Sequence, residues 1–90
     1  MGTALITLKV MPESPDVDLE ELKEKSKALI EKGEGKIDEI KEEPIAFGLK
    51  AVIISFALDE SKELEPMEKE LNALENVSSV QVVDMRRAFG

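Results

Sequence analysis

The chain has 90 residues, the size of one small domain, and 42% of them are hydrophobic, which is enough for a modest core. Its 12 Lys and Arg are outnumbered by 20 Asp and Glu, and the net charge of −8 argues against wrapping nucleic acid, whose phosphates would repel the protein. The lack of Cys and His excludes disulfides, imidazole acid–base catalysis and the usual zinc sites, so no metal or cofactor is expected.

No targeting or membrane segment is predicted. No apolar run reaches the ~18 residues that a membrane helix needs. The N-terminal residues read as a strand rather than as a signal peptide. We therefore expect a cytoplasmic protein that folds as a single domain over residues 1–90.

The first predicted element is a half-buried strand over residues 3–11, where apolar and polar side chains alternate. Its apolar face consists of Ala4, Ile6, Leu8 and Val10. Leu5 is an apolar residue on the otherwise polar face. Pro12 and Pro15 end the strand, because proline disfavours continued pairing.

A helix is predicted to begin after Asp18. The Asp18 carboxylate can accept hydrogen bonds from first-turn amides, and Glu21 follows three residues later, as in a capping box. The inward stripe of this helix consists of Leu19, Leu22, Ser26, Leu29 and Ile30. Gly33 and Gly35 predict its end.

Two strands follow, with opposite character. Residues 36–43 carry many charges, as expected of a protected edge strand, with Ile37 inward and Ile40 as a second inward candidate. Residues 48–58 are apolar on both faces, which is typical of a central strand. One of those faces consists of Val52, Ile54, Phe56 and Leu58.

The last two elements are a helix and a strand. The helical stripe consists of Leu64, Met67, Leu71 and Leu74. Pro66 is tolerated only in a first turn, so this helix should start between Ser61 and Pro66. Residues 77–87 form a strand with Val80 and Val82 inward, and Asp84 in the same phase predicts a bulge or an edge exit there.

The order strand–helix–strand–strand–helix–strand is that of the ferredoxin-like split βαβ fold, of the α+β class. It predicts a four-stranded antiparallel sheet with both helices on one face, the first and third strands central and the other two at the edges. The uncovered face would carry Leu5, Ala51 and Ile53. Such a patch is either a partner surface or tolerated apolar exposure.

The segment over residues 43–50 joins two of the strands and places Phe47, one of only 3 phenylalanines, beside Gly48. Two interpretations are open. The aromatic ring is an exposed docking element, since connections often carry function. Alternatively, the segment is a plain hairpin connection in which Phe47 folds back onto the core.

Three segments resemble a known family. Residues 44–50 (Pro-Ile-Ala-Phe-Gly-Leu-Lys) resemble the signature of translation elongation factor 1-beta, the guanine-nucleotide exchange factor of the elongation GTPase. Residues 9–20 resemble the opening of the archaeal members, and residues 82–87 resemble their ending. Together the three segments span most of the chain in the family's order.

The resemblance implies a set of residues that bind the GTPase. Phe47, flanked by Gly48, would anchor the contact, and Lys50 and Arg86 would assist. Arg87 matches a terminal lysine of the eukaryotic members that reaches toward the Mg²⁺ and phosphate region. The chain departs from that pattern in having arginine there and residues 88–90 beyond it.

The partner implied is the elongation factor 1-alpha GTPase, on which the protein would promote exchange of GDP for GTP without covalent chemistry. We expect a monomer with no direct nucleic-acid or membrane contact. The main alternative is a ferredoxin-like regulatory domain that binds a small ligand or dimerises through the sheet. An acylphosphatase-like enzyme is disfavoured, because residues 11–17 offer no arginine for a phosphate cradle.

Overall fold

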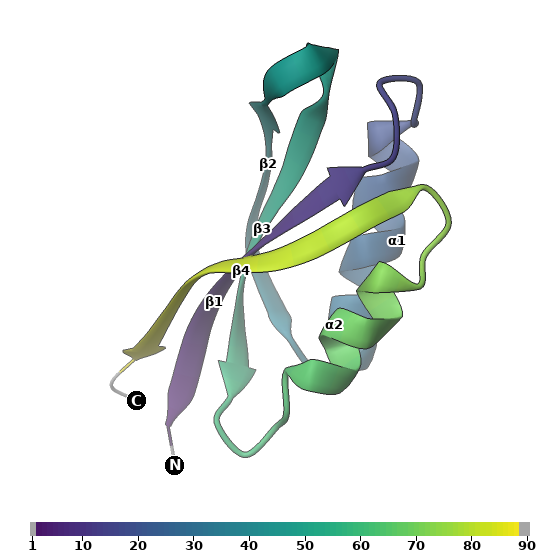
Figure 1. The fold of residues 1–90 in the computed structure, drawn as a ribbon. Coiled ribbons are helices and arrows are strands. Elements are labelled where there is room, and N and C mark those ends of the chain that lie inside the picture. The colour runs from purple at the N-terminus through teal and green to yellow at the C-terminus, as the bar shows by residue number, and fades with distance from the viewer. Residues whose placement is uncertain (1, 89–90) are drawn as a thin grey trace.

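The computed structural model describes residues 2–88 as a four-stranded antiparallel sheet with two α-helices packed on one face (Figure 1). In chain order the elements are β1 (Thr3–Pro12), α1 (Leu19–Lys32), β2 (Lys36–Pro44), the 3₁₀ turn η1 (Ala46–Gly48), β3 (Lys50–Asp59), α2 (Glu65–Asn72) and β4 (Val77–Ala88). The strand order is β2-β3-β1-β4, so β3 and β1 are central. The predicted ferredoxin-like fold is confirmed.

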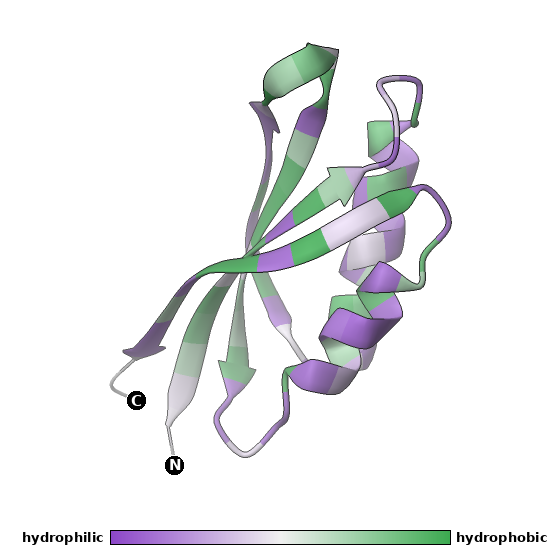
Figure 2. Cartoon of the chain, viewed as in Figure 1, coloured by the Kyte–Doolittle hydropathy of each residue, from purple (hydrophilic) through white to green (hydrophobic). Residues whose placement is uncertain are grey.

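The core lies between the sheet and the helices. Because side chains alternate along a strand, every second residue of β1 and β3 points toward the helices, and the apolar stripes of the helices pack against these residues. The fully buried large side chains there are Leu8, Val10, Ile30, Val52, Ile54, Phe56 and Leu71. Figure 2 shows the complementary pattern, in which hydrophilic residues line much of the outer side of both helices.

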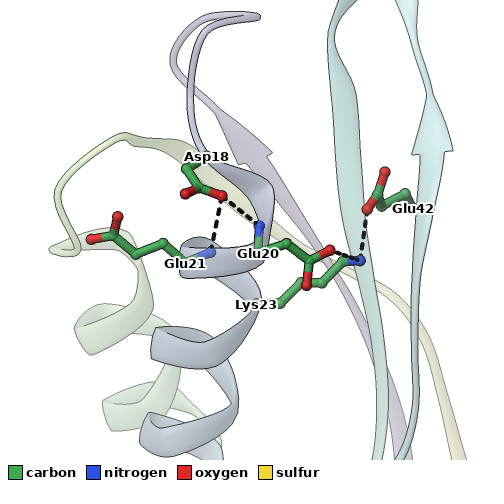
Figure 3. Close-up of polar contacts among 5 residues, drawn as sticks. All are labelled: Asp18, Glu20, Glu21, Lys23 and Glu42. Carbon is green, nitrogen blue, oxygen red and sulfur yellow. Dashed lines mark hydrogen bonds and ion pairs between the residues drawn. The ribbon is translucent and has the colours of Figure 1, made fainter.

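The first helix begins where its cap predicts. Asp18 Oδ1 accepts hydrogen bonds from the backbone amides of Glu20, at 3.0 Å, and Glu21, at 3.3 Å (Figure 3). The Glu21 carboxylate pairs with Lys25 at 2.9 Å. The second helix begins at Glu65, inside the predicted interval, with Pro66 in its first turn.

Two of the three register shifts in the sheet set which side chains face the core. In β2 the register shifts between Ile37 and Glu39, so Ile37 and Ile40 both pack against the core. In β4 the register shifts after Val82, which pairs with Leu8, so that Asp84 pairs with Thr7 on the opposite face. The bulge predicted near Asp84 is therefore confirmed.

Three expectations are corrected. Strand β3 begins at Lys50 and not at residue 48, because the two preceding residues belong to the turn. Val82 was expected inward but is 39% exposed, since it lies on the edge strand β4. Ala51 and Ile53 lie on the uncovered face as expected, yet they were expected to be exposed there and are only 0% and 8% exposed.

The burial of Ile53 has a local cause. Its cross-strand neighbours are Lys9 of β1 and Lys41 of β2. The aliphatic stems of long charged side chains can cover an apolar neighbour while their ammonium groups stay in water. Ala51 is small and lies opposite Glu43 of β2. Among the described residues, the large apolar side chains still exposed on this face are Leu5, at 45%, and Val83 of β4, at 50%, which borders the same hollow as Ile53.

Neither helix within residues 2–88 is long and apolar enough to cross a membrane.

Candidate functional site

The connection between β2 and β3 is a tight hairpin end. The Ile45 amide donates to the Leu49 carbonyl at 2.8 Å, and the Leu49 amide donates back to the Ala46 carbonyl at 3.3 Å. The two residues between Ala46 and Leu49 are Phe47 and Gly48, and their φ angles are 63° and 73°. Two successive residues with positive φ are the pattern of the type I′ turn, whose twist matches that of the flanking strands.

Phe47 occupies this turn against its own preference. With ψ at 29° it lies in the left-handed region, which costs a non-glycine residue roughly 1–2 kcal/mol. Gly48 meets the same demand without that cost. A β-carbon at Gly48 would meet no atom within 4 Å, so backbone conformation and not space favours glycine there.

The Phe47 side chain is 93% exposed. The interpretation in which this ring folds back onto the core is therefore wrong. Leaving a phenylalanine in water forgoes roughly 1.5–3 kcal/mol of burial free energy, and the strained backbone adds to that cost. Figure 2 shows that the surrounding hairpin tip is also mostly hydrophobic. An apolar tip of this kind is typical of a docking element.

An ion pair braces the hairpin against the first helix. Lys23 Nζ of α1 lies 2.6 Å from Glu42 Oε2 of β2 and 3.3 Å from Glu20 Oε1 (Figure 3). The hydrogen bond from Lys23 holds the pKa of Glu42 below its usual value, and the bond to Glu42 raises the pKa of Lys23. Lys50, the exposed first residue of β3, adds a weaker positive charge near Glu42.

The two arginines lie near the other end of the sheet, on opposite faces of β4. Arg86 pairs with Leu5 in the strand register, and Arg87 pairs with Ala4, so alternation sends their side chains apart, as predicted. Arg86 Nε contacts Asp84 Oδ2 at 2.9 Å. Arg87 Nε contacts Glu60 Oε1 at 2.8 Å. Both arginine side chains stay more than three quarters exposed, at 76% and 78%.

An open cleft of about 530 Å³ lies beside Arg87. Its apolar lining consists of Ala4, Ile6, Leu58, Leu64 and Met85. Charged groups of the β3–α2 turn, Glu60 among them, border it together with the arginines. Sequence reasoning missed Glu60, since its proximity to Arg87 depends on how β1 pairs with β3 and β4. It also missed Met85, although Met85 lies two residues before Arg87 on the same face of β4 and could have been found from strand alternation.

The five predicted site residues form two separate groups. The hairpin group consists of Phe47, Gly48 and Lys50, and the C-terminal group consists of Arg86 and Arg87. Leu5 of β1 pairs with Arg86 of β4 on one side and with Ala57 of β3 on the other, so these residues lie at the same level of the sheet. Lys50 lies seven residues before Ala57 on β3. At ~3.3 Å per residue, the two groups are about 23 Å apart along the strand. Figure 1 shows the hairpin tip at one end of the molecule and the start of β1 and the end of β4 at the other.

Within residues 2–88 no three acidic side chains gather in a way that could hold a metal ion. Phe89 and Gly90, which follow the arginines, lie outside the described residues.

Comparison with known proteins gives a consistent family. A family model described as the EF-1 guanine nucleotide exchange domain matches residues 5–88. The elongation factor 1-beta of Methanosarcina barkeri is 48% identical over 88 residues, covering 97% of this chain and 99% of that protein. The elongation factor 1-beta of Methanococcus maripaludis strain C6 is 43% identical over 86 residues, covering 94% and 97% respectively.

Solved structures of other proteins share the fold. Ribosomal protein S6 of Thermotoga maritima superimposes with a TM-score of 0.67 at 21% identity, over 98% of this chain and 89% of that one. The ACT domain of the GTP pyrophosphokinase of Chlorobium tepidum gives a TM-score of 0.64 at 15% identity, over 88% and 96%. At these identities the likeness concerns the fold alone.

Proposed function

The chain belongs to the EF-1 guanine nucleotide exchange domain family, and from this premise we propose that it acts on elongation factor 1-alpha, promoting the exchange of bound GDP for GTP. Its function is that of an elongation factor 1-beta, a guanine nucleotide exchange factor of protein synthesis. The observation that supports a specific docking element is the side chain of Phe47, 93% exposed on a strained turn.

In this proposal the hairpin group makes the first anchoring contact. Phe47 would insert its ring into an apolar pocket of the GTPase, which returns the burial free energy that the free protein forgoes. Gly48 keeps the turn tight enough to present the ring, and Lys50 adds a positive charge beside it. The brace between Lys23 and Glu42 limits swinging of the hairpin, so less conformational entropy is lost on docking.

The C-terminal group would act on the nucleotide site. GDP is held by a phosphate loop and by Mg²⁺, an ion that requires nearly ideal octahedral coordination. A guanidinium placed near that ion repels it and offers the phosphates a competing partner. Arg87 is assigned this role, and Arg86, on the opposite face of β4, is assigned a peripheral contact with the GTPase.

No covalent step is required by this mechanism. If the protein weakens GDP binding, linkage requires GDP to weaken binding of the protein by the same factor. The protein would thus speed nucleotide release without changing the final balance of GDP and GTP. We further propose that it works as a cytoplasmic monomer, without a cofactor and without contacting nucleic acid or a membrane.

The direct test loads elongation factor 1-alpha with fluorescent GDP and follows its release in the presence of excess unlabelled GTP. Adding the chain should raise the release rate and leave the end point unchanged. Arg87→Ala should lower the maximal rate far more than Arg86→Ala does, while both bind nucleotide-free GTPase with similar affinity. A chain that leaves the release rate unchanged, and is dimeric by native mass spectrometry, would instead be a regulatory domain of this fold.

A further inference from the structure

We propose that Glu60 is a positioning residue for Arg87, fixing the guanidinium at the end of β4 so that it reaches the nucleotide site in one orientation. This inference rests on the proposed function of Arg87. It concerns a residue of the β3–α2 turn that none of the resembling segments contains.

The backbone of Glu60 is held in place independently of Arg87. It follows the last residue of β3, and its backbone amide donates to the Gly2 carbonyl at 3.0 Å. Its carboxylate lies so close to Gly2 that a β-carbon there would collide with it. The Glu60 side chain is 29% exposed, against 78% for Arg87. A partly buried carboxylate on an anchored backbone therefore meets a mostly exposed arginine.

The geometry of the contact favours positioning over masking. Glu60 Oε1 contacts Nε, the innermost guanidinium nitrogen, at 2.8 Å. Terminal N–H groups of the five-donor guanidinium fork remain for a second oxyanion such as a phosphate. Holding the side chain in one rotamer beforehand reduces the entropy lost when it engages that anion.

The chain contains a matched control on the other face of β4. Arg86 Nε contacts Asp84 Oδ2 at 2.9 Å, so the two pairs have the same chemistry and nearly the same length. Asp84, however, lies on the same strand two residues earlier and is 47% exposed. It ties Arg86 to no other element, whereas Glu60 ties Arg87 across to the β3–α2 turn.

The first experiment needs no GTPase. Because the chain has only two arginines, its ¹⁵N spectrum should contain two Nε–Hε resonances, and Arg87→Lys assigns them. Glu60→Ala should shift only the Arg87 resonance and speed its exchange with solvent, and Asp84→Ala should affect only that of Arg86. An Arg87 resonance that is unchanged in Glu60→Ala overturns the proposal.

The second experiment measures GDP release from the GTPase. Glu60→Ala should lower the maximal release rate about two- to fivefold, the range that exposed ion pairs support, with unchanged affinity for nucleotide-free GTPase. Glu60→Gln, which keeps an acceptor for Nε, should restore part of the loss. In an Arg87→Ala background Glu60→Ala should have no further effect.

Each contrary outcome has a distinct meaning. A faster rate in Glu60→Ala would show that Glu60 masks Arg87, and an equal loss in the Arg87→Ala background would show an independent structural role. Either result overturns the positioning role. If the wild-type chain does not speed GDP release from the GTPase, the proposed function is wrong. The ¹⁵N experiment then still decides whether Glu60 orders the Arg87 side chain.

Discussion

At the scale of single residues, Phe47 carries two local costs at once. It adopts a left-handed backbone conformation that glycine or asparagine would adopt more easily, and it exposes 93% of its side chain to water. Strain of this kind persists where the surrounding structure over-determines it, and it is enriched at functional sites. Here the hydrogen bonds from the Ile45 amide to the Leu49 carbonyl and from the Leu49 amide to the Ala46 carbonyl hold the turn in that conformation.

The first prediction concerns this residue. Phe47→Ala should lower the rate of GDP release at least about tenfold, since truncating an aromatic interface anchor commonly costs ~2 kcal/mol or more. The free energy of unfolding should change by less than about 0.5 kcal/mol, as for other exposed positions. Stopped-flow nucleotide release and urea denaturation measure the two quantities.

Phe56→Ala is the control for that prediction. Phe56 is 1% exposed in the core, so its truncation should cost ~3–5 kcal/mol of folding stability. The docking role of Phe47 is wrong if the Phe47→Ala variant unfolds at as low a urea concentration as Phe56→Ala. It is also wrong if this variant promotes GDP release from the GTPase as fast as the wild type does.

The second prediction concerns Ser26, which is fully buried on the inner face of α1. Its Oγ has no hydrogen-bond partner among the described residues. A buried hydroxyl without a partner is destabilising, and alanine is also the better helix former. Ser26→Ala should therefore raise the free energy of unfolding by about 1 kcal/mol, measured by urea denaturation.

The exposed Ser78 in β4 offers a comparison for this change, since Ser78→Ala should leave stability nearly unaltered. Destabilisation by Ser26→Ala would mean that the hydroxyl is hydrogen-bonded in solution.

At the scale of elements, the ion pair between Lys23 and Glu42 joins α1 to the charged edge strand β2. The Lys23 and Glu42 side chains are 21% and 31% exposed, so water still screens the pair and it contributes modestly, but it couples the hairpin to the body of the fold. Because the pKa of Glu42 is lowered in the folded state, the stabilisation is present above its usual value of 4.5. It is lost as the pH falls through the folded pKa.

The third prediction concerns the pH dependence of this pair. Glu42→Gln should lower the thermal midpoint at about pH 7, where the wild-type carboxylate is charged, and the difference should shrink as the pH falls below 4.5 and through the folded pKa. Glu43→Gln removes the same charge from the neighbouring position, for which the described residues show no ion pair. It should leave the hairpin brace intact. A Glu42→Gln difference that persists in acid would show that the pair does not stabilise the fold.

At the scale of the whole molecule, the sheet holds the two groups of candidate residues apart. The described chain extends 42 Å along its longest axis and only 20 and 17 Å along the others. The hairpin tip and the end of β4, which carries the two arginines, lie toward opposite ends of this body (Figure 1). A partner that engages both groups must therefore offer an extended surface, which a small ligand does not.

The fourth prediction uses this separation. Because Phe47 and Arg87 are about 23 Å apart or more along the sheet, their effects on transition-state stabilisation should add in free energy. Each single variant lowers the GDP-release rate per unit concentration of the chain by some factor, and in the Phe47→Ala, Arg87→Ala double variant these two factors should multiply. The measurement is made at low factor concentration. A double variant no slower than the worse single variant would indicate that the two residues act through one shared contact.

Most of the fold could be predicted from the sequence. Local periodicity identified the strands and helices, and the cap at Asp18, the glycines after α1 and Pro66 set the helix boundaries to within a residue or two. The element order then left few topologies, of which the ferredoxin-like sheet was confirmed. The motif over residues 44–50 indicated the family that comparison also shows.

Only the tertiary structure decided the surroundings of the candidate residues. A sequence records which side of a strand a residue faces, but not which side chains from other strands cover it, and so Ile53 between Lys9 and Lys41 was misjudged. The backbone of Phe47 and the partnership of Glu60 with Arg87 depend on turn geometry and strand register. The cover over Ile53 and the Glu60–Arg87 pair are contacts between residues distant in the chain, and the turn at Phe47 is set by backbone hydrogen bonds, so the apolar pattern of the sequence carries no information about them.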